Sequence, residues 1–472
     1  MSMDKSLAGL YWSVGCLLGA LSISSSHAEW ATYRGDNARS GVSQETLSVP
    51  LTEAWTYQSR HRPQPAWKGE AKWDGWNKVY DMKSRQTFDY AFQVVMHDGA
   101  VFFGSSADDK IYSLDATTGQ ERWAFFTEGP VRFAPTIYQG RAYVGSDDGR
   151  IYCLDAATGA VVWKVNPGPR DYRIAGNSRV ISAWPARAGV IIQGGIAYTA
   201  VGMFPSEGVH ICALDPETGE VLWRQIQTDL PAQGYLLASA TRLYVPTGRN
   251  NPVVLDIADG KRLRVVQGQG GTYALLAGDS LIFGPGKVGQ LGLIDGEASD
   301  QLAQFAGNHM IVTGGKSYLH SDYSLSVLDR DRYLSLARER KSKLTEQSRL
   351  GDELKKLRKD GQANGAKARE IKQTVLSLGR AVDALSSQMS DCELWKVACD
   401  YPLDLILADS LLIAGGEGRV GAFDAADGKH VWEASVNGRV FGLAAGARRL
   451  FVSTDEGAIH CFIGGQRAEL VE

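Results

Sequence analysis

Short runs of alternating apolar and polar residues dominate the chain and return at a regular spacing. The clearest example is residues 141–165, RAYVGSDDGRIYCLDAATGAVVWKV, in which three runs of β-strand composition are separated by two turns. The segments SDDG and DAATG have turn composition, because Asp, Ser and Gly favour tight bends of the backbone. Three strands cannot bury their faces alone, so the segment predicts neighbouring copies of itself.

The second of these turns recurs along the chain with the pattern Asp-x-x-Thr-Gly-x-x-x-Trp. Asp and Thr accept backbone N–H bonds, Gly adopts a positive φ, and Trp offers a large flat surface to the next unit. The Asp and Trp positions are Asp115 and Trp123, Asp155 and Trp163, Asp215 and Trp223, and Asp424 and Trp432. Aligned turns begin at residues 115, 155, 215, 256, 295, 329, 424 and 463. Five of the seven intervals lie near 40 residues, the repeat length of a four-stranded propeller blade.

The repeat predicts an all-β fold: an eight-bladed β-propeller of four-stranded antiparallel blades that occupies residues 29–472. The last unit stops after its third strand, whereas residues 51–57 form a Trp-bearing strand, around Trp55, with no unit before it. We expect this strand to seal the ring by pairing with the last blade, because closure removes exposed strand edges.

The longest interval contains an insertion, residues 330–391, that has helical rather than strand periodicity. Ile371, Val375, Leu378, Val382, Leu385 and Met389 follow a heptad seam, and Leu336, Leu344, Leu350, Leu354 and Leu357 follow a looser one. The segment DGQANG separates the two arms and has turn composition. The sequence therefore predicts an antiparallel coiled-coil hairpin inserted in blade six. It is either a basic docking arm or a solvated spacer.

A second interruption, residues 58–91, lies between the sealing strand and the first full blade. It combines basic residues with the aromatic residues Trp67, Trp73, Trp76, Tyr80, Phe88 and Tyr90. Loops of this length are usually functional or disordered, and aromatic residues at this density argue against disorder. We interpret it as a strap packed across one face of the ring, with polymer binding as the alternative.

The first 28 residues have the features of a signal peptide. Lys5 precedes an apolar stretch at residues 7–23, and the segment SHA ending at Ala28 has cleavage-site composition. A retained membrane anchor is the alternative. The chain is therefore expected to be exported and to lie in the periplasm or cell envelope. The net charge of −3 gives no reason to expect a nucleic-acid partner.

The Asp-x-x-Thr-Gly-x-x-x-Trp units resemble those of the pyrroloquinoline-quinone-like (PQQ-like) β-propeller repeat family, across nearly all of the mature chain. The opening segment WATYRGDNARSGV resembles the lead-in of exported bacterial proteins with these repeats. The resemblance implies one of two roles: a quinoprotein dehydrogenase, or a non-enzymatic propeller of the outer-membrane-assembly type. The dehydrogenases typically have adjacent cysteines and a calcium site. No two cysteines are adjacent here, and no spaced calcium loop is present.

Catalytic signals are weak elsewhere, so no catalytic residue and no metal ligand is predicted. The histidines are scattered one or two per unit without metal-ligand spacing. The best candidate binding surface is a rim of loops that lead into innermost strands, with an insertion between the second and third units. Its candidate residues are Arg132, Arg173, Asn177, Arg179, Trp184, Arg187 and Arg439. Arginine clusters bind carboxylates, although the same residues could instead tie neighbouring blades together.

Five cysteines follow the predicted leader, and an odd number does not describe a disulfide framework. Cys392 and Cys399 flank a short strand and could form one disulfide in an oxidising compartment.

Taken together, the sequence predicts an exported, non-enzymatic binding or scaffold protein with no cofactor. Its partners are expected to be envelope proteins that bind through residues 330–391, with peripheral membrane contact also open. The alternatives are a PQQ- and calcium-dependent oxidoreductase and a binder of carbohydrate or cell-surface polymer.

Overall fold

The structure is a computed structural model that describes residues 29–67, 78, 80, 82, 84–268, 270–278, 280–286, 289–294 and 301–465. The predicted signal peptide, Trp73 and Trp76 of the strap, and the repeat position Asp295 lie outside the described residues.

Six separate four-stranded antiparallel sheets are present in the described part of the chain. The first consists of β3 (Val94–His97), β4 (Ala100–Ser105), β5 (Lys110–Asp115) and β6 (Glu121–Phe126), and the second of β7 (Thr136–Tyr138), β8 (Arg141–Gly145), β9 (Ile151–Asp155) and β10 (Val161–Val165). The third consists of β13 (Ile191–Gln193), β14 (Ile196–Val201), β15 (Val209–Leu214) and β16 (Val221–Gln227), and the fourth of β17 (Leu237–Ala238), β18 (Arg242–Val245), β19 (Val253–Asp256) and β20 (Arg262–Val265). The fifth consists of β21 (Tyr273–Ala277), β22 (Ser280–Gly284), β23 (Gln290–Ile294) and β24 (Gln301–Ala306), and the sixth of β25 (His309–Thr313), β26 (Lys316–His320), β27 (Ser324–Asp329) and β28 (Glu393–Ala398).

An eight-stranded sheet joins the two ends of the chain. It contains β1 (Val42–Ser43), β29 (Asp404–Ala408), β30 (Leu411–Gly415), β31 (Glu417–Asp424), β32 (His430–Gly446), β33 (Arg449–Thr454), β34 (Ala458–Gly464) and β2 (Leu51–Gln58). The first part of β32 pairs with β31 and its second part with β33. At the far edge β2 pairs antiparallel with β34, so the N-terminal strand completes the C-terminal part of the sheet.

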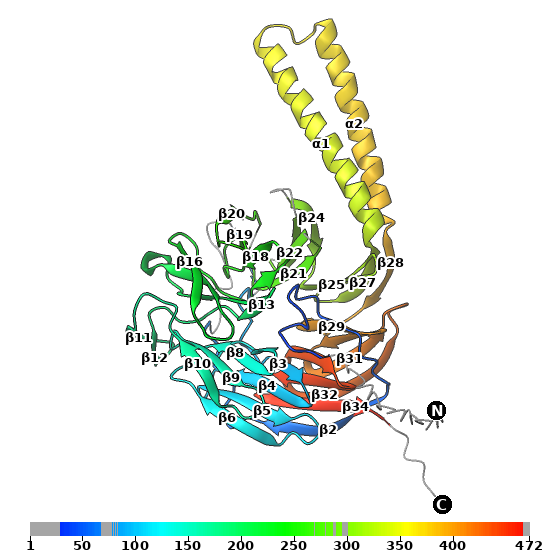
Figure 1. Cartoon of the computed structure of the whole chain (residues 1–472). Helices are drawn as coiled ribbons and strands as arrows, with labels where there is room; N and C mark the ends of the chain where they lie inside the picture. The colour runs from blue at the N-terminus through cyan, green and yellow to red at the C-terminus, as the bar shows by residue number, and fades with distance from the viewer. Residues whose placement is uncertain are drawn as a thin grey trace, which may run out of the picture.

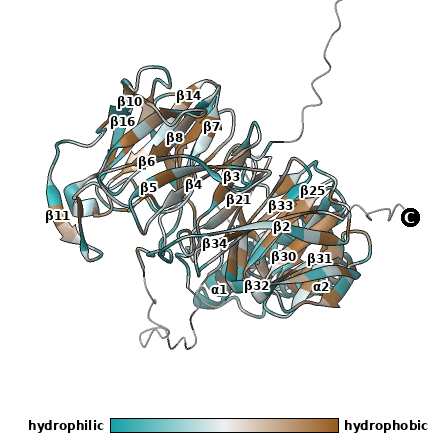
Figure 2. Ribbon diagram, turned by 90° about the horizontal axis from the view of Figure 1, so that it is seen from below, coloured by the Kyte–Doolittle hydropathy of each residue, from teal (hydrophilic) through white to brown (hydrophobic). Residues whose placement is uncertain are grey.

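The sheets surround a common centre (Figure 1), and their innermost strands contact one another around it. Inner strands such as β4 and β15 are buried along their whole length, whereas outer strands such as β10 and β16 alternate between exposed and half-buried positions. Apolar residues accordingly concentrate in the strands and polar ones in the outer turns (Figure 2). The prediction of a mostly β protein made of four-stranded antiparallel sheets is confirmed.

Two long helices interrupt the sixth sheet between β27 and β28: α1 (Arg330–Lys359) and α2 (Ala366–Ser390). The Asp329 side chain caps α1 by accepting from the N–H of Arg332. Side-chain contacts join Arg340 to Ser386 near the base and Glu353 to Lys367 near the tip, so the helices run antiparallel. Together they form an arm that projects from the ring (Figure 1).

The seam between the two helices follows the predicted heptad on α2, where Ile371, Val382 and Leu385 are buried. On α1 the assignment of Leu344 to the seam is wrong, because this side chain is exposed. Leu350 of the predicted seam is buried, and the other buried residues of α1 are Leu334 and Ala337, which the heptad did not include. The first turns of α1 pack against the ring rather than only against α2, and this shifts the buried face at the base.

Two further elements are small. β11 (Arg173–Gly176) and β12 (Arg179–Ser182) form a two-stranded hairpin in the insertion between the second and third sheets. A single turn of 3-10 helix covers Pro205–Glu207.

Candidate functional site

The centre of the ring is occupied by the segment directly after the predicted leader, residues 30–43, which we call the channel segment. Trp30 exchanges two backbone hydrogen bonds with Met96 of β3, at 3.2 and 2.9 Å. Further along, the carbonyl groups of Ala31 and Ala38 accept from β7 and β21, and β1 pairs parallel with β29. The channel segment therefore bonds to innermost strands on different sides of the ring.

Two buried arginines fasten the channel segment to its surroundings. Arg34 forms an ion pair of 3.0 Å with Asp404 of β29 and donates to the carbonyl of Leu405. Arg39 donates to the carbonyl of Leu236 and, at 2.7 Å, to the hydroxyl of Thr32. Burial lowers the pKa of Arg39 to about 10. Arg34 therefore has a charged partner within the protein, whereas Arg39 donates to neutral oxygens and its buried Nη2 has no hydrogen-bond partner among the described residues.

An aromatic stack continues from the channel segment toward the opposite face. Tyr33 stacks on Tyr235 with ring centroids 3.5 Å apart. Tyr235 meets Phe133 edge to face at 4.8 Å, and Phe133 stacks on Phe88 of the strap at 4.9 Å. Four rings from four separate segments therefore fill the centre of the ring between the channel segment and the strap.

The described part of the strap lies over the loops that enter the innermost strands. Trp67 and Gln86 both donate to the side-chain oxygen of Gln233, and the carbonyl of Arg85 accepts from Thr272. The ring of Tyr90 contacts Phe441 of β32 at 5.2 Å. The strap thus spans contacts from the fourth and fifth sheets to the eight-stranded sheet.

Three of the predicted rim residues meet around one buried carboxylate, Asp147. Arg132 Nε lies 2.8 Å and Arg187 Nη2 lies 2.9 Å from Asp147 Oδ2. Asn177 accepts from Arg187 and donates to the carbonyl of Ala66 in the strap. Burial alone would raise the pKa of Asp147, but the two guanidinium groups outweigh it and lower this pKa.

Arg132 also pairs at 2.8 Å with Asp89, a buried residue of the strap. Burial raises the pKa of Asp89, although Arg132 acts in the opposite direction. Sequence reasoning missed both carboxylates as members of the rim: it assigned Asp147 only to a turn and did not single out Asp89. Their proximity to Arg132 depends on contacts that no local pattern displays.

The other predicted rim residues also have partners inside the chain. Arg173 pairs with Glu128 and Asp171. Arg179 Nη1 donates to both carboxylate oxygens of Asp109, at 2.6 and 2.7 Å. Trp184 donates to the carbonyl of Glu207. Arg439, on β32, pairs with Asp455 at 2.7 Å and lies apart from the Asp147 cluster. A ligand-binding role of these residues stays a prediction.

The repeat tryptophans dock onto neighbouring units. In five joints the indole lies against the turn glycine of the next unit: Trp55 on Gly119, Trp123 on Gly159, Trp163 on Gly219, Trp223 on Gly260 and Trp395 on Gly428. The indole N–H groups of Trp55, Trp123 and Trp163 donate to a carbonyl next to that turn, at 3.0–3.1 Å. Trp432 instead donates to Leu51, at the start of β2. The turn aspartates Asp115, Asp155, Asp215 and Asp424 accept backbone N–H bonds within these turns.

Strand register places Ala303 of β24 at the position that tryptophan occupies elsewhere. Ala303 pairs with Leu293 directly before the bulge, as Trp123 pairs with Ser113. The following unit is the sixth sheet, in which the arm replaces the turn. Leu334 belongs to the same buried cluster as Ala303, and Tyr333 contacts Phe305 at 5.3 Å.

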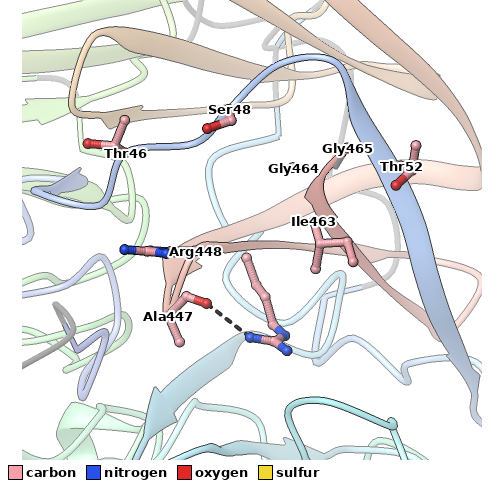
Figure 3. A pocket seen from close by; sticks show the side chains of 9 residues that line it. Thr46, Ser48, Thr52, Ala447, Arg448, Ile463, Gly464 and Gly465 are labelled. Atoms are coloured by element: carbon pink, nitrogen blue, oxygen red, sulfur yellow. Dashed lines mark hydrogen bonds between the residues drawn. The ribbon is translucent and has the colours of Figure 1, made fainter. Parts of the chain in front are cut away.

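Two large cavities in the described part of the chain lie outside the centre. One, of about 1050 Å³, lies at the seam of the ring, where Thr46, Ser48 and Thr52 face the Ala447–Arg449 turn and the end of β34 (Figure 3). The nine described residues that line it include no carboxylate, histidine or cysteine. The other, of about 700 Å³, lies at the base of the arm.

The proposed disulfide between Cys392 and Cys399 is wrong. Both are buried free thiols, as are the other three cysteines of the described chain. The two residues flank β28, and a fully extended strand of this length holds their Cα atoms about 20 Å apart. A disulfide requires a Cα separation below about 7 Å.

Within the described ranges, no three His, Cys, Asp or Glu side chains are grouped closely enough to hold a metal ion. Among the same residues, neither helix has the length and apolar character needed to cross a membrane.

Comparison with known proteins shows which structures and which family this chain is similar to. No curated protein matches the sequence. The quinohemoprotein alcohol dehydrogenase of Comamonas testosteroni is 15% identical, with a TM-score of 0.60 over 94% of this chain and 82% of its own. The designed Ika8 protein is 12% identical, with a TM-score of 0.54 over 80% of this chain and 98% of its own. BamB of Moraxella catarrhalis is 13% identical, with a TM-score of 0.41 over 88% and 99%. At these identities the first two matches show a shared fold alone.

A family model described as outer membrane protein assembly factor BamB matches residues 53–195, 147–312 and 387–466. These ranges leave out residues 313–386, which contain nearly all of the arm. Because they cover more than half of the sequence, this chain belongs to the BamB family of PQQ-type repeat proteins.

Proposed function

We propose that this protein is a non-enzymatic binding or scaffold protein of the cell envelope, an eight-bladed propeller that uses the arm to bind a partner protein. In this interpretation the eight-stranded sheet contributes two blades that share β32. The family description, which names an outer membrane assembly factor, supports an envelope location.

The observation that carries the proposal is the contrast between a filled centre and a free arm. A propeller usually holds a ligand at its centre. Here the centre is filled by the channel segment, the four contacting aromatic rings and the strap. The arm leaves the ring and exposes most of its polar surface (Figure 1). A surface that projects this far is available to a large partner, whereas the centre is not.

Deletion of residues 345–380, with a short turn of Gly and Asn in their place, tests this proposal and keeps the base of the arm, where Tyr333 and Leu334 pack against the ring. We expect the shortened protein to fold and to lose most of the proteins that co-purify with the full chain from envelope extracts, measured by quantitative mass spectrometry. A full-length Leu222→Ala variant, altered at one exposed residue of the outer strand β16, is the control, and it should keep the partners of the parent. An unchanged set of partners after the deletion would contradict the proposal.

The quinoprotein alternative finds little support in the residues of the centre. A planar quinone there would have to displace Tyr33, Tyr235, Phe133 or Phe88, which contact one another directly. Arg132 and Arg187, two cationic side chains beside the strap, are already paired: Arg132 with Asp89 and Asp147, and Arg187 with Asp147. The residues do not fit the cofactor, and we propose that none is bound. Dye reduction by the protein after addition of the quinone and calcium, with alcohols or sugars as substrates, would contradict this.

Among the described residues of the strap, one exposed aromatic group favours polymer binding. Tyr80 is 69% exposed, whereas the rings of Phe88 and Tyr90 contact the ring of blades. Trp67 is hydrogen-bonded to Gln233 and also turned inward. We rank this function below partner binding. A glycan array in which the protein retained specific polysaccharides would reverse that order.

A further inference from the structure

The cavity at the base of the arm, which we call the arm groove, is lined by apolar and polar residues. The apolar ones include Phe305, Leu319, Leu328, Tyr333 and Met389, contributed by the fifth sheet, the sixth sheet and both helices. Its volume of about 700 Å³ lies within the range of binding sites that take a peptide side chain or a small ligand. Aromatic rings and methionine favour an apolar or aromatic guest.

The arm groove runs along the open edge of a strand. β24 is the last strand of its sheet, with β23 on one side only. Gln304, Phe305 and Ala306 of β24 all line the groove, although successive side chains of a strand point to opposite faces. A cavity that touches three successive residues must pass along the edge of the strand. An edge of this kind offers backbone N–H and C=O groups to an extended chain.

The charged residues that line the arm groove favour an acidic peptide. Within the described residues, Arg340 bonds at 2.8 Å to the hydroxyl of Ser386 and pairs with no carboxylate. Lys396 lies 3.9 Å from Glu393, a loose contact of two half-exposed side chains. Two cationic groups therefore face the groove against one carboxylate. Arg340 differs in this respect from Arg132, Arg179 and Arg187, each of which forms an ion pair with a carboxylate.

We propose that the arm groove binds an extended acidic peptide segment of a partner protein, which pairs with β24 and places an aromatic side chain against Phe305 and Tyr333. The proposal rests on the proposed binding function and adds the place and the chemistry of recognition. The arm contributes one wall, so a partner bound along the arm would bring its peptide to this site.

The experiment uses the pentapeptide Thr-Asp-Trp-Asp-Thr, labelled with fluorescein at its N-terminus and amidated at its C-terminus, with the full-length protein. Fluorescence anisotropy should show at least tenfold tighter binding than for the same peptide with Ala in place of Trp. A version N-methylated at alternate backbone nitrogens should bind at least tenfold more weakly, because it cannot pair with a strand edge. A peptide with Lys in place of both Asp residues should also bind more weakly.

Two variants test the site itself. Ser390→Trp, at an exposed position of α2 that lines the arm groove, should fill the groove and weaken binding at least tenfold. Arg340→Gln should weaken binding of the acidic peptide about threefold or more. Arg349→Gln is the matched control, because Arg349 lies on the same helix outside the lining and pairs with Glu346. If Ser390→Trp fails to keep the parent's thermal midpoint, Ser324→Phe fills the groove from β27 instead.

Equal binding of the Ala peptide, or undiminished binding by a folded Ser390→Trp protein, would overturn the proposal. The outcome is separable from that of the arm deletion. If deletion removes partners while Ser390→Trp retains all of them, the arm binds elsewhere and only the groove proposal fails. If deletion changes no partner, the proposed function fails.

Discussion

Two joints between neighbouring units of this ring can be compared, and they differ in what fills the space between sheets. At the repeat joints an indole lies flat on the turn glycine of the next unit, as Trp123 does on Gly159. At the arm joint the tryptophan position is Ala303, and Tyr333 and Leu334 of α1 pack beside it. The space is filled from the following unit instead of the preceding one.

This difference shows how a long insertion can be accommodated without opening the ring. An arm in place of the turn removes the glycine surface that would receive an indole, and a small residue on the preceding outer strand makes room for the first turn of α1. The arm is thereby built into the core of the joint rather than tethered by a loop. Its base is packed against the ring, while its tip projects away from it, where a partner could reach it (Figure 1).

The largest effect is expected at a repeat joint. Trp123→Ala should lower the free energy of unfolding by about 3–5 kcal/mol, because it removes a large packed side chain and the hydrogen bond to Ala156. Guanidinium unfolding measures this loss. Trp223→Ala is the comparison, since the buried N–H of Trp223 has no partner, and it should cost about 1 kcal/mol less. Equal losses would show that the hydrogen bond contributes nothing to the joint.

The glycine side of the joint gives the next effect. Gly159 has φ +73° and a Cβ there would lie 2.6 Å from the Trp123 ring, whereas Gly140 has φ +71° and open space around it. Gly140→Ala should cost about 1–2 kcal/mol for the left-handed backbone alone. Gly159→Ala should cost a further 1–3 kcal/mol, roughly, because the added Cβ would clash with the Trp123 ring. Thermal and chemical unfolding of the two variants separates the cost of backbone strain from that of the clash with the indole. Identical losses would show that the indole–glycine contact does not contribute to stability.

At the arm joint, Leu334→Ala should lower the free energy of unfolding by about 2–4 kcal/mol, because Leu334 is buried between the arm and the fifth sheet. The matched control on the same arm is Leu376→Ala, whose side chain is 65% exposed and whose loss should stay within about 0.5 kcal/mol. Both values come from chemical unfolding. Similar small losses for both would mean that the arm is only tethered to the ring.

The smallest effect concerns acid. A hydrogen bond from Arg122 lowers the pKa of Asp115 to about 2. The pKa of Asp in the unfolded chain is about 3.9. The contribution of Asp115 to stability is therefore complete above that pH and is lost as the pH falls through the folded pKa of about 2. Asp115→Asn should therefore be less stable than the parent at pH 6 and equal to it at pH 2, in thermal unfolding across that range. Arg122→Gln should show the same convergence, and a constant difference at all pH values would argue against the ion pair.

The parts of the fold that depend on local pattern could be predicted from the sequence. The spacing of Asp115, Asp155 and Asp215 and their tryptophans gave the four-stranded units, because each turn forms from its own residues. The heptad from Ile371 to Leu385 gave the buried face of α2 for the same reason. Leu344 was misassigned because it follows Leu336 by eight residues rather than seven, a step that turns its side chain away from the seam.

The candidate site was less predictable, because it is made by contacts between distant segments. The sequence singled out Arg132 and Arg187 by type, but only the fold shows that both are buried on Asp147. The opening segment could be recognised as a lead-in, yet its place in the channel rests on pairs such as Arg34 with Asp404, 370 residues apart. The arm groove requires β24 and α2 to be adjacent, and no local signal encodes that.

The central claim, that partners bind the arm rather than the ring, is tested most directly by crosslinking inside cells. The photoreactive residue p-benzoylphenylalanine would replace Leu376 on α2 or, as the matched position, Leu222 on the outer strand β16; these leucines are 65% and 51% exposed. After irradiation we predict discrete crosslinked species from position 376 and few or none from position 222. Crosslinks from position 222 alone, or equal crosslinking from both, would contradict the claim.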